Sequence, residues 1–387
     1  MDTIKKLYRA KPYFPKEDRD WIQAAWKDIL FTGMFIQGKY VKQFEDLFAD
    51  LCGTKYAIAT NSGATALEVM IRATGIEGKK FLCPTQTFVA SVSAIERSNN
   101  IPVITDIDPI TQCLSLDIIK ENVDEYTAGV MWVHMGGRIA PDYLEIKQYC
   151  EDNNLVLLED ASHAVGAKID NNVYAGNLGL AGAFSLFATK IITSGEGGMI
   201  TTNDEKLAEQ CRILRNHGCV RNDSPVPGLD FGVTCSVASS NYRMPEMAAA
   251  IGVTQIKRTY EFVDKRNLLA DRYKEILNSD KLEVPNIPDN TIMTWWQYIV
   301  ALPKGTTLEQ RTKFCEDLLT KYKIPTANAY WPACHEQPAF KEFVGDQTYP
   351  VADELLLRHL ALPMYVEMDL RQVEYVANSV NELLNDY

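Results

Sequence analysis

Between residues 56 and 202 the chain alternates short apolar segments with longer amphipathic ones, and this alternation constrains the fold more than any other feature. Short apolar runs bounded by turn residues are typical of buried strands, and longer periodic runs are typical of helices. Seven strands are predicted, at 56–59, 80–83, 102–106, 129–134, 155–160, 183–187 and 199–202. Strands that alternate with helices predict an α/β fold with a large, mainly parallel seven-stranded sheet.

Helical patterns flank this region on both sides. Before it, helices are predicted over 15–30 and 40–51; after it come a long helical stretch at 245–277, a strand-like run at 296–302, and helices at 308–321 and 369–384. A chain of 387 residues is longer than one compact core usually holds. We therefore expect a large α/β domain over 1–255 and a smaller C-terminal α+β domain over 256–387.

The charge balance and the cysteines narrow the functional class. The formal net charge is −12, which argues against nucleic-acid binding, because that requires a basic face. The nine cysteines are widely spaced and include no Cys-x-x-Cys, so we expect reduced thiols and no metal site. No apolar run reaches the length of a membrane span, and the first residues lack an apolar signal core. A cytoplasmic protein with no membrane partner is expected.

Ligands of open α/β sheets bind where the carboxyl ends of the strands meet. That rule gathers four loops around one predicted crevice: 61–65, 85–88, 160–163 and 185–190. The last of these contains Lys190, which follows a strand and precedes the glycine-rich turn at 195–198. A lysine in such a position can form a Schiff base with a carbonyl cofactor. The alternative is an ordinary exposed lysine before a turn.

Asp160 ends a predicted strand and could keep the ring nitrogen of a pyridoxal cofactor protonated through a charge-assisted hydrogen bond. A cap of the following helix is an equal alternative. Glu159 points to the other face of the strand and is the weaker candidate. His163 could bond near the ring oxygen of the cofactor, or could be a capping or core histidine.

The stretch 61–67 is a turn of small residues that follows a predicted strand and begins a helix. The exposed amides and the dipole at a helix start are suited to an anion such as the cofactor phosphate. Ser185 could add a hydroxyl group. The alternative is an ordinary N-cap. Phe88 follows a strand end and could stack on a flat ring, although a core phenylalanine is the commoner role.

The order of these motifs resembles one family, the DegT/DnrJ/EryC1/StrS sugar aminotransferases, which have the aspartate aminotransferase fold (fold type I). The matching stretches are 44–53, 61–67, 84–90, 159–164, 184–198, 217–218, 241–244 and 335–339. The resemblance implies pyridoxal 5'-phosphate as the cofactor, Lys190 as its Schiff-base lysine, Asp160 as its ring-nitrogen partner and Phe88 as its stacking residue.

The resemblance also implies that Ser185 and the turn at Gly63, Ala64 and Thr65 hold the phosphate. Thr65 stands one position later than the family's threonine, and His163 stands where glutamine is common. The active site would lie at a homodimer interface, with Asn241 reaching the cofactor phosphate of the partner. Lys39, Arg243 and His335 are candidates for the substrate, and a solvated surface lysine is the alternative for Lys39.

The family implies an aminotransferase that converts a nucleotide-linked keto sugar, such as a keto-6-deoxy sugar, to an amino sugar with glutamate as donor. Lipopolysaccharide or O-antigen synthesis is the implied setting. Three alternatives stay open. One is a keto-cyclitol aminotransferase. Another is a sugar dehydratase, disfavoured because that branch replaces the lysine with histidine. The third is a non-catalytic sugar-binding regulatory protein on the same fold.

Overall fold

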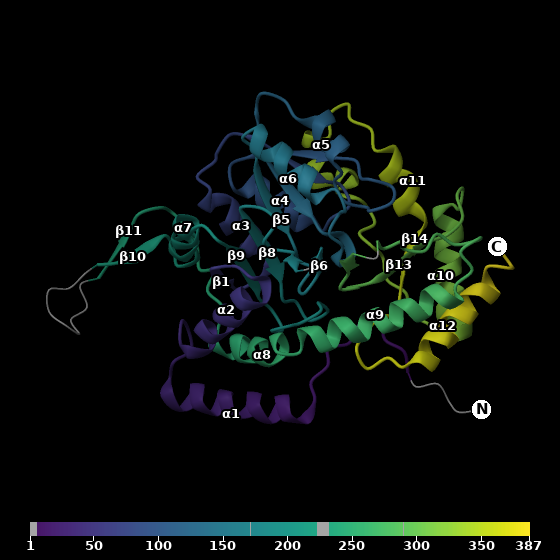
Figure 1. Cartoon of the computed structure of the whole chain (residues 1–387), viewed down its shortest axis with the longest axis horizontal. Helices are drawn as coiled ribbons and strands as arrows, with labels where there is room; N and C mark the ends of the chain where they lie inside the picture. The colour runs from purple at the N-terminus through teal and green to yellow at the C-terminus, as the bar shows by residue number, and fades with distance from the viewer. Residues whose placement is uncertain (1–5, 171, 223–231, 289) are drawn as a thin grey trace.

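The computed structural model describes residues 6–170, 172–222, 232–288 and 290–387, and a seven-stranded sheet lies at its centre (Figure 1). The strands are β1 (Tyr56–Thr60), β2 (Lys80–Pro84), β3 (Ile101–Thr105), β4 (Thr127–Val133), β5 (Val156–Asp160), β8 (Ala181–Ser185) and β9 (Gly198–Thr202). Their order is β1-β9-β8-β5-β4-β2-β3. Only β9 runs antiparallel to its neighbours in this sheet.

All seven predicted strands therefore belong to one sheet, and the predicted fold class is confirmed. Residues 129–133 of β4 and all of β9 are buried, as expected for strands covered on both faces. The strand predicted at 183–187 instead spans 181–185, so Ser185 ends it and Lys190 lies on the loop that follows.

Helices cover both faces of the sheet. They are α1 (Lys16–Thr32), α2 (Lys39–Cys52), α3 (Gly63–Ala73), α4 (Val89–Arg97), α5 (Leu116–Asn122), α6 (Tyr143–Asp152), α7 (Glu205–Arg215) and α8 (Glu246–Ile256). One buried apolar cluster draws on α2, α6 and α8, and a second draws on α3, α4 and α7. The expected end of α2 is confirmed at Gly53, which adopts a left-handed conformation with φ of 67°.

The predicted helical stretch at 245–277 is two helices, α8 and α9 (Thr259–Ile276), which meet at residues 257–258. Beyond them lie α10 (Leu308–Tyr322), α11 (Pro350–Arg358), α12 (Leu370–Leu383) and the antiparallel pair β13 (Tyr298–Ala301) and β14 (His359–Leu362). Apart from Leu7, a third buried cluster draws only on residues 269–384. The domain division near residue 255 stays a prediction.

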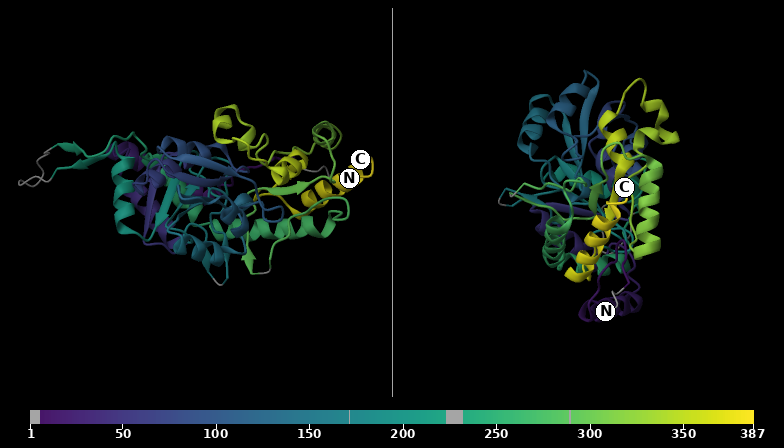
Figure 2. Two further views of the ribbon diagram at one scale, coloured as in Figure 1. Left: turned by 90° about the horizontal axis from the view of Figure 1, so that it is seen from above. Right: turned by 90° about the vertical axis from the view of Figure 1, so that its right-hand side faces the viewer.

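Smaller elements complete the described ranges. β6 (Lys168–Ile169), β7 (Val173–Tyr174) and β12 (Thr291–Ile292) form a three-stranded sheet. β10 (Cys219–Arg221) and β11 (Val233–Cys235) form a hairpin that projects from the body of the molecule (Figures 1 and 2). Within the described residues, every helix is too short or too polar to span a bilayer.

Candidate active site

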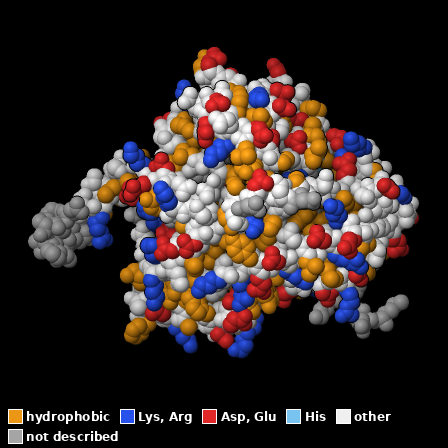
Figure 3. Space-filling model, viewed as in Figure 1, with side chains coloured by type: hydrophobic (Ala, Val, Ile, Leu, Met, Phe, Trp, Pro, Cys, Tyr) orange, Lys and Arg blue, Asp and Glu red, His pale blue; other side chains and the backbone are white. Residues whose placement is uncertain are grey.

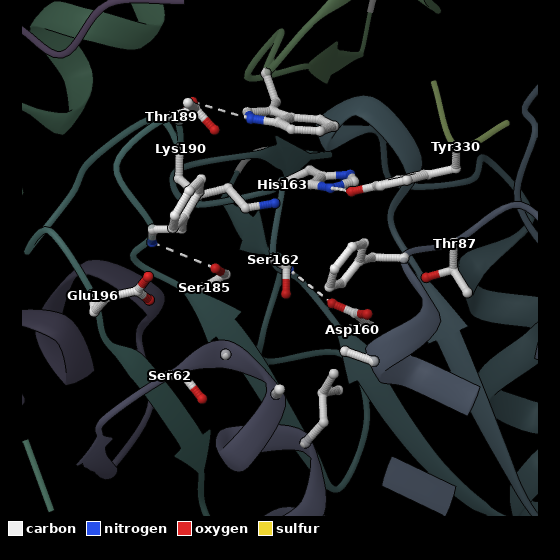
Figure 4. Close-up of a pocket in the computed structure, with 17 residues that line it drawn as sticks. Ser62, Thr87, Asp160, Ser162, His163, Ser185, Thr189, Lys190, Glu196 and Tyr330 are labelled. Atoms are coloured by element: carbon white, nitrogen blue, oxygen red, sulfur yellow. Dashed lines mark hydrogen bonds between the residues drawn. The ribbon is translucent and has the colours of Figure 1, made fainter. Parts of the chain in front are cut away.

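A pocket of about 410 Å³ opens at the carboxyl ends of the parallel strands (Figure 4). All four predicted loops contribute to it, and segments far away in the sequence complete it. Its lining comprises Ser62, Gly63, Ala64, Leu67, Thr87, Phe88, Ala90, Asp160, Ser162, His163, Ser185, Phe187, Thr189, Lys190, Glu196, Trp296 and Tyr330.

Lys190 projects from the loop after β8 into the middle of the pocket (Figure 4). Its Nζ lies 4.2 Å from the ring centroid of Trp296. Loss of hydration lowers the pKa of Lys190 from 10.5 to about 7, and the Asp160 carboxylate opposes this shift. Much of the amine is therefore uncharged at neutral pH, as a nucleophile or base requires.

Asp160, the last residue of β5, is held in one orientation by two hydrogen bonds. Its Oδ1 accepts from the backbone N–H of Ser162 at 3.1 Å, and its Oδ2 accepts from Oγ of Ser91 at 2.6 Å. Ser91 Oγ also lies 2.7 Å from Oγ1 of Thr87. Residues 161–167 form turns, so the alternative of a helix cap is wrong and the carboxylate is left facing the pocket.

Glu159 points to the opposite face, as strand alternation predicts. Its Oε2 lies 2.8 Å from Nε2 of His134 and accepts from the N–H of Gly176 at 2.7 Å. Its Oε1 accepts from the N–H of Leu178 at 2.7 Å. These contacts give Glu159 a role in fixing the loop after β7, away from the pocket.

An aromatic wall closes the pocket above Lys190. The rings of His163 and Trp296 stack with centroids 4.0 Å apart, and Nε2 of His163 lies 2.6 Å from the Tyr330 hydroxyl. Trp296 Nε1 donates to the carbonyl of Thr189 at 3.1 Å. Burial, and then the charge of Lys190, keep the pKa of His163 well below 6.5, so its ring is neutral at pH 7. Its Nδ1 is buried and lacks a partner among the described residues.

The opposite end of the pocket is the start of α3. The N-cap Ser62 accepts from the N–H of Thr65 at 3.2 Å, and the first amides of the helix, at Gly63 and Ala64, have no intrahelical acceptor. A Cβ added to Gly63 would meet the Cβ of Ser185 at 2.7 Å. Only glycine permits this approach, which sets the Ser185 hydroxyl beside the helix start and suits an anion there.

Thr65 itself is directed into the cap. Its hydroxyl oxygen lies 2.8 Å from Oδ1 of Asn61 and 2.9 Å from the carbonyl oxygen of Ser62, which compete for its one proton, and it accepts from the N–H of Ser62. The predicted phosphate contact of Thr65 gains no support from this geometry. Phe88 is 58% exposed at the N-cap of α4 and lines the pocket, so the core-phenylalanine alternative is wrong.

The four remaining predicted residues lie outside this pocket lining. Lys39 pairs with Asp28 at 2.8 Å on the surface. His335 lies 2.7 Å from Oγ1 of Thr85 and 2.9 Å from Oδ1 of Asp353 through its two ring nitrogens. Asn241 and Arg243 follow the β10–β11 hairpin; Asn241 is exposed, and its carbonyl accepts from Nδ2 of Asn61, next to the start of α3.

The pocket fits the cofactor that the resemblance implies. Lys190 supplies a partly uncharged amine, and Asp160 supplies a buried, oriented carboxylate for a protonated ring nitrogen. The tight approach of Gly63 to Ser185 leaves a helix start with free amides and a hydroxyl for the phosphate. Phe88 supplies an exposed aromatic face.

Sequence reasoning missed Ser91, Trp296 and Tyr330. Ser91 lies one turn into α4, three residues after Phe88, and a serine on the buried face of a helix after a predicted ligand loop could have indicated it. Trp296 and Tyr330 come from the C-terminal part of the chain, more than 100 residues beyond His163. No local pattern announces such a long-range contact.

Comparison with known proteins gives one consistent result. Residues 16–381 match the model of the DegT/DnrJ/EryC1/StrS aminotransferase family. The chain is 31% identical to GDP-perosamine synthase of Escherichia coli O157:H7, over 92% of this chain and 93% of that protein. It is 31% identical to dTDP-3-amino-3,6-dideoxy-alpha-D-galactopyranose transaminase of Aneurinibacillus thermoaerophilus, over 93% and 94% of the two chains.

Among solved structures, the chain resembles Helicobacter pylori PseC, an aminotransferase involved in the biosynthesis of pseudoaminic acid. The TM-score is 0.90 at 23% identity, over 99% of this chain and 100% of that chain. At that identity the likeness is one of fold.

Proposed function

The chain belongs to the DegT/DnrJ/EryC1/StrS aminotransferase family, and we propose that its substrates are a nucleotide-linked keto-6-deoxy sugar and glutamate. It is a pyridoxal phosphate-dependent sugar aminotransferase that converts a keto sugar to an amino sugar. The relatives named for GDP- and dTDP-linked amino sugars support a nucleotide-linked substrate. The 3,6-dideoxy sugar in one of those names supports the 6-deoxy class.

One observation carries the proposal: a lysine amine with a pKa of about 7 shares a pocket with an oriented, buried carboxylate and a helix start suited to phosphate. Lys190, Asp160, Ser185 and the amides of Gly63 and Ala64 would hold pyridoxal phosphate. When bound, that cofactor supplies an electron sink for moving a proton next to the transferred nitrogen.

Each residue has a definable task. Nζ of Lys190 would take and return a proton at the donor carbon, because its lowered pKa lets it act in both directions near neutral pH. The Asp160 carboxylate, fixed by Ser91, would keep a positive charge on the ring nitrogen of the bound cofactor. The rings of His163, Trp296 and Tyr330 would shield one side of the amine from water.

A homodimer with shared active sites is part of the proposal. Large apolar side chains are exposed at and after the end of α1, and Phe31 is 93% exposed; the cluster comprises Leu30, Phe31, Met34, Phe35 and Ile36. Hydrophobic side chains gather over this end of α1 in Figure 3. A patch of this kind favours burial against another copy. Asn241, exposed beside the pocket turn, would then be able to serve the partner's phosphate site, and Lys39, Arg243 and His335 stay candidates for the substrate.

The proposed location is the cytoplasm. All nine cysteines are free, including six that are buried, and reducing compartments keep thiols in that state. Lipopolysaccharide or O-antigen synthesis is the proposed setting, in line with the perosamine relative.

The test is the visible absorbance of the protein reconstituted with pyridoxal phosphate. We expect a lysine-bound cofactor band that glutamate removes with release of 2-oxoglutarate, absent in Lys190→Ala and unchanged in Lys206→Ala, a variant of an exposed lysine on α7. Adding a nucleotide-linked keto sugar should then restore the absorbance band and yield the amino sugar.

The alternatives give different outcomes. A keto-cyclitol aminotransferase would transfer the amino group to a cyclitol ketone but not to a nucleotide-linked keto sugar. A dehydratase would release substrate oxygen without consuming glutamate. A regulatory protein would bind the sugar with no change in absorbance on adding glutamate.

A further inference from the structure

The β10–β11 hairpin holds two cysteines opposite each other. The register of the antiparallel pair sets Cys219 against Cys235, with Val220 against Thr234 and Arg221 against Val233. Residues directly opposite on antiparallel strands point to the same side of the hairpin. Both thiols are free, and Cys235 is exposed while Cys219 is partly exposed.

The hydrogen bonds show which kind of pair this is. Ser236 N–H donates to the carbonyl of Gly218 at 2.9 Å, and Cys219 N–H donates to the carbonyl of Asn216 at 3.0 Å. The ladder bonds therefore flank the two cysteines without joining them. In such a non-hydrogen-bonded pair the Cα atoms lie about 4.5 Å apart and the side chains are at their closest. A disulfide spans about 4.4–6.8 Å between Cα atoms.

The two sulfur atoms also share one neighbour. Sγ of Cys219 lies 3.8 Å from the carbonyl oxygen of His217, and Sγ of Cys235 lies 3.6 Å from the same atom. The pKa of the Cys219 thiol is raised, first by burial and then by the adjacent Cys235 sulfur. Of the other seven cysteines, six are buried and Cys315 is partly exposed.

We propose that Cys219 and Cys235 form a site of reversible oxidation, closing an intramolecular disulfide across the hairpin. The oxidant is a small-molecule disulfide such as oxidised glutathione. The exposed Cys235 thiolate attacks it, forming a mixed disulfide and releasing one reduced glutathione. The Cys219 thiolate then attacks the Cys235 sulfur and releases the second. Each protein thiol loses one proton and one electron, and glutathione disulfide gains both pairs.

The bond would tie together the base of a segment that leads to the active site. After β11 the chain returns to the body, where Asn241 bridges to Asn216 and its carbonyl accepts from Asn61 at 3.2 Å. Asn61 directly precedes the N-cap of α3. Exposed cross-strand disulfides are of the labile class, so the reaction should reverse with glutathione.

The test is mass spectrometry of the full-length holoenzyme after incubation with oxidised glutathione and alkylation of the remaining thiols. Wild type should lose two hydrogens and protect two thiols. Trypsin should yield peptide 216–221 joined to peptide 222–243, and reduced glutathione should separate them. Cys219→Ser should instead retain one glutathionyl group on Cys235, because the attacking thiol is gone. Cys315→Ser, the matched control, should behave as wild type.

Three results would overturn the proposal. One is full alkylation of both thiols after oxidation. Another is stable glutathionylation of wild-type Cys235 without passage to the internal bond. The third is a disulfide between two copies of the chain, detected as a dimer on a non-reducing gel. None of these readouts depends on aminotransferase activity, so the outcome is separate from that of the proposed substrates.

Discussion

The hydroxyl of Tyr330 lies 2.6 Å from Nε2 of His163, joining a residue from the C-terminal part of the chain to the loop after β5. His163 is buried and Tyr330 half-buried at the pocket, and the ring of His163 also stacks on that of Trp296. Because His163 is neutral, this hydrogen bond joins two uncharged side chains. It fixes the position of the aromatic wall relative to Lys190.

Tyr330→Phe should therefore weaken both stability and activity. The ring is kept, but the buried His163 nitrogen loses its partner, which costs about 1–3 kcal/mol in free energy of unfolding. We expect kcat/KM to fall about tenfold, because the aromatic wall is no longer fixed. Urea unfolding and steady-state kinetics measure the two effects.

Tyr375→Phe is the control for that variant. The Tyr375 hydroxyl donates to the carbonyl of Tyr322 at 2.8 Å, outside the pocket. This variant should lose about 1 kcal/mol of stability with kcat/KM unchanged. Equal losses of activity in the two variants would show that the Tyr330 bond has no specific part in the site.

Ser91→Ala should lower activity by releasing the Asp160 carboxylate. Ser91 donates at 2.6 Å to the carboxylate of Asp160, and hydrogen bonds to charged groups contribute about 1.5–3 kcal/mol. Without this bond the carboxylate can turn from the ring nitrogen, so kcat/KM should fall by roughly 10- to 100-fold. The control is Ser98→Ala at the end of the same helix, whose hydroxyl donates to the carbonyl of Ala94 at 2.6 Å. An effect of Ser98→Ala as large as that of Ser91→Ala would refute the assigned role.

The amine of Lys190 should titrate near neutral pH in the cofactor-free protein. Its pKa is lowered from 10.5 to about 7, so below pH 7 the amine is protonated and unreactive, and above pH 7 it is free. The rate of its reaction with an amine-specific reagent should rise with increasing pH, with a midpoint near pH 7. Peptide mass spectrometry measures the extent of modification at Lys190. In urea the midpoint should move to about 10.5, the value for an exposed lysine. A folded-state midpoint close to the unfolded one would contradict the proposed shielding of the amine from water.

Local patterns were enough to predict the sheet and the four loops of the pocket. Lys190, Asp160, His163 and Phe88 each stand at a strand end or on the loop that follows it, and the parallel sheet brings such positions to one edge. Their roles toward the cofactor and substrate stay predictions.

Side-chain direction was harder to predict. Thr65 lies in the correct turn, but the capping box with Ser62 uses its hydroxyl, and a threonine at the third helical position is a weak sequence signal for that motif. Trp296 and Tyr330 reach the pocket only through the packing of distant segments. Such contacts follow from tertiary structure, and no local periodicity in the sequence predicts them.

Glu246 offers the last prediction, because it caps a helix other than its own. It lies in the first turn of α8, yet its Oε1 accepts from the N–H of Gly38 at 2.8 Å and of Val41 at 3.1 Å, and its Oε2 accepts from the N–H of Tyr40 at 2.8 Å. The N-cap of α2, Gly38, has no side chain to do this. The negative charge of a carboxylate at a helix N-terminus also interacts favourably with the helix dipole.

Glu246→Ala should lower the free energy of unfolding by about 2 kcal/mol, since it leaves buried amides at the start of α2 without acceptors. Glu246→Gln should lose less, because one acceptor oxygen stays. Glu205→Ala is the control: that residue is also in a first turn, but Asp204 caps α7 by accepting from Leu207 N–H at 2.9 Å, so the change should stay within about 0.5 kcal/mol. Urea midpoints decide the matter. If Glu246→Ala unfolds at the same midpoint as Glu205→Ala, the bonds across the two helices contribute nothing measurable, and α2 is held by its apolar face alone.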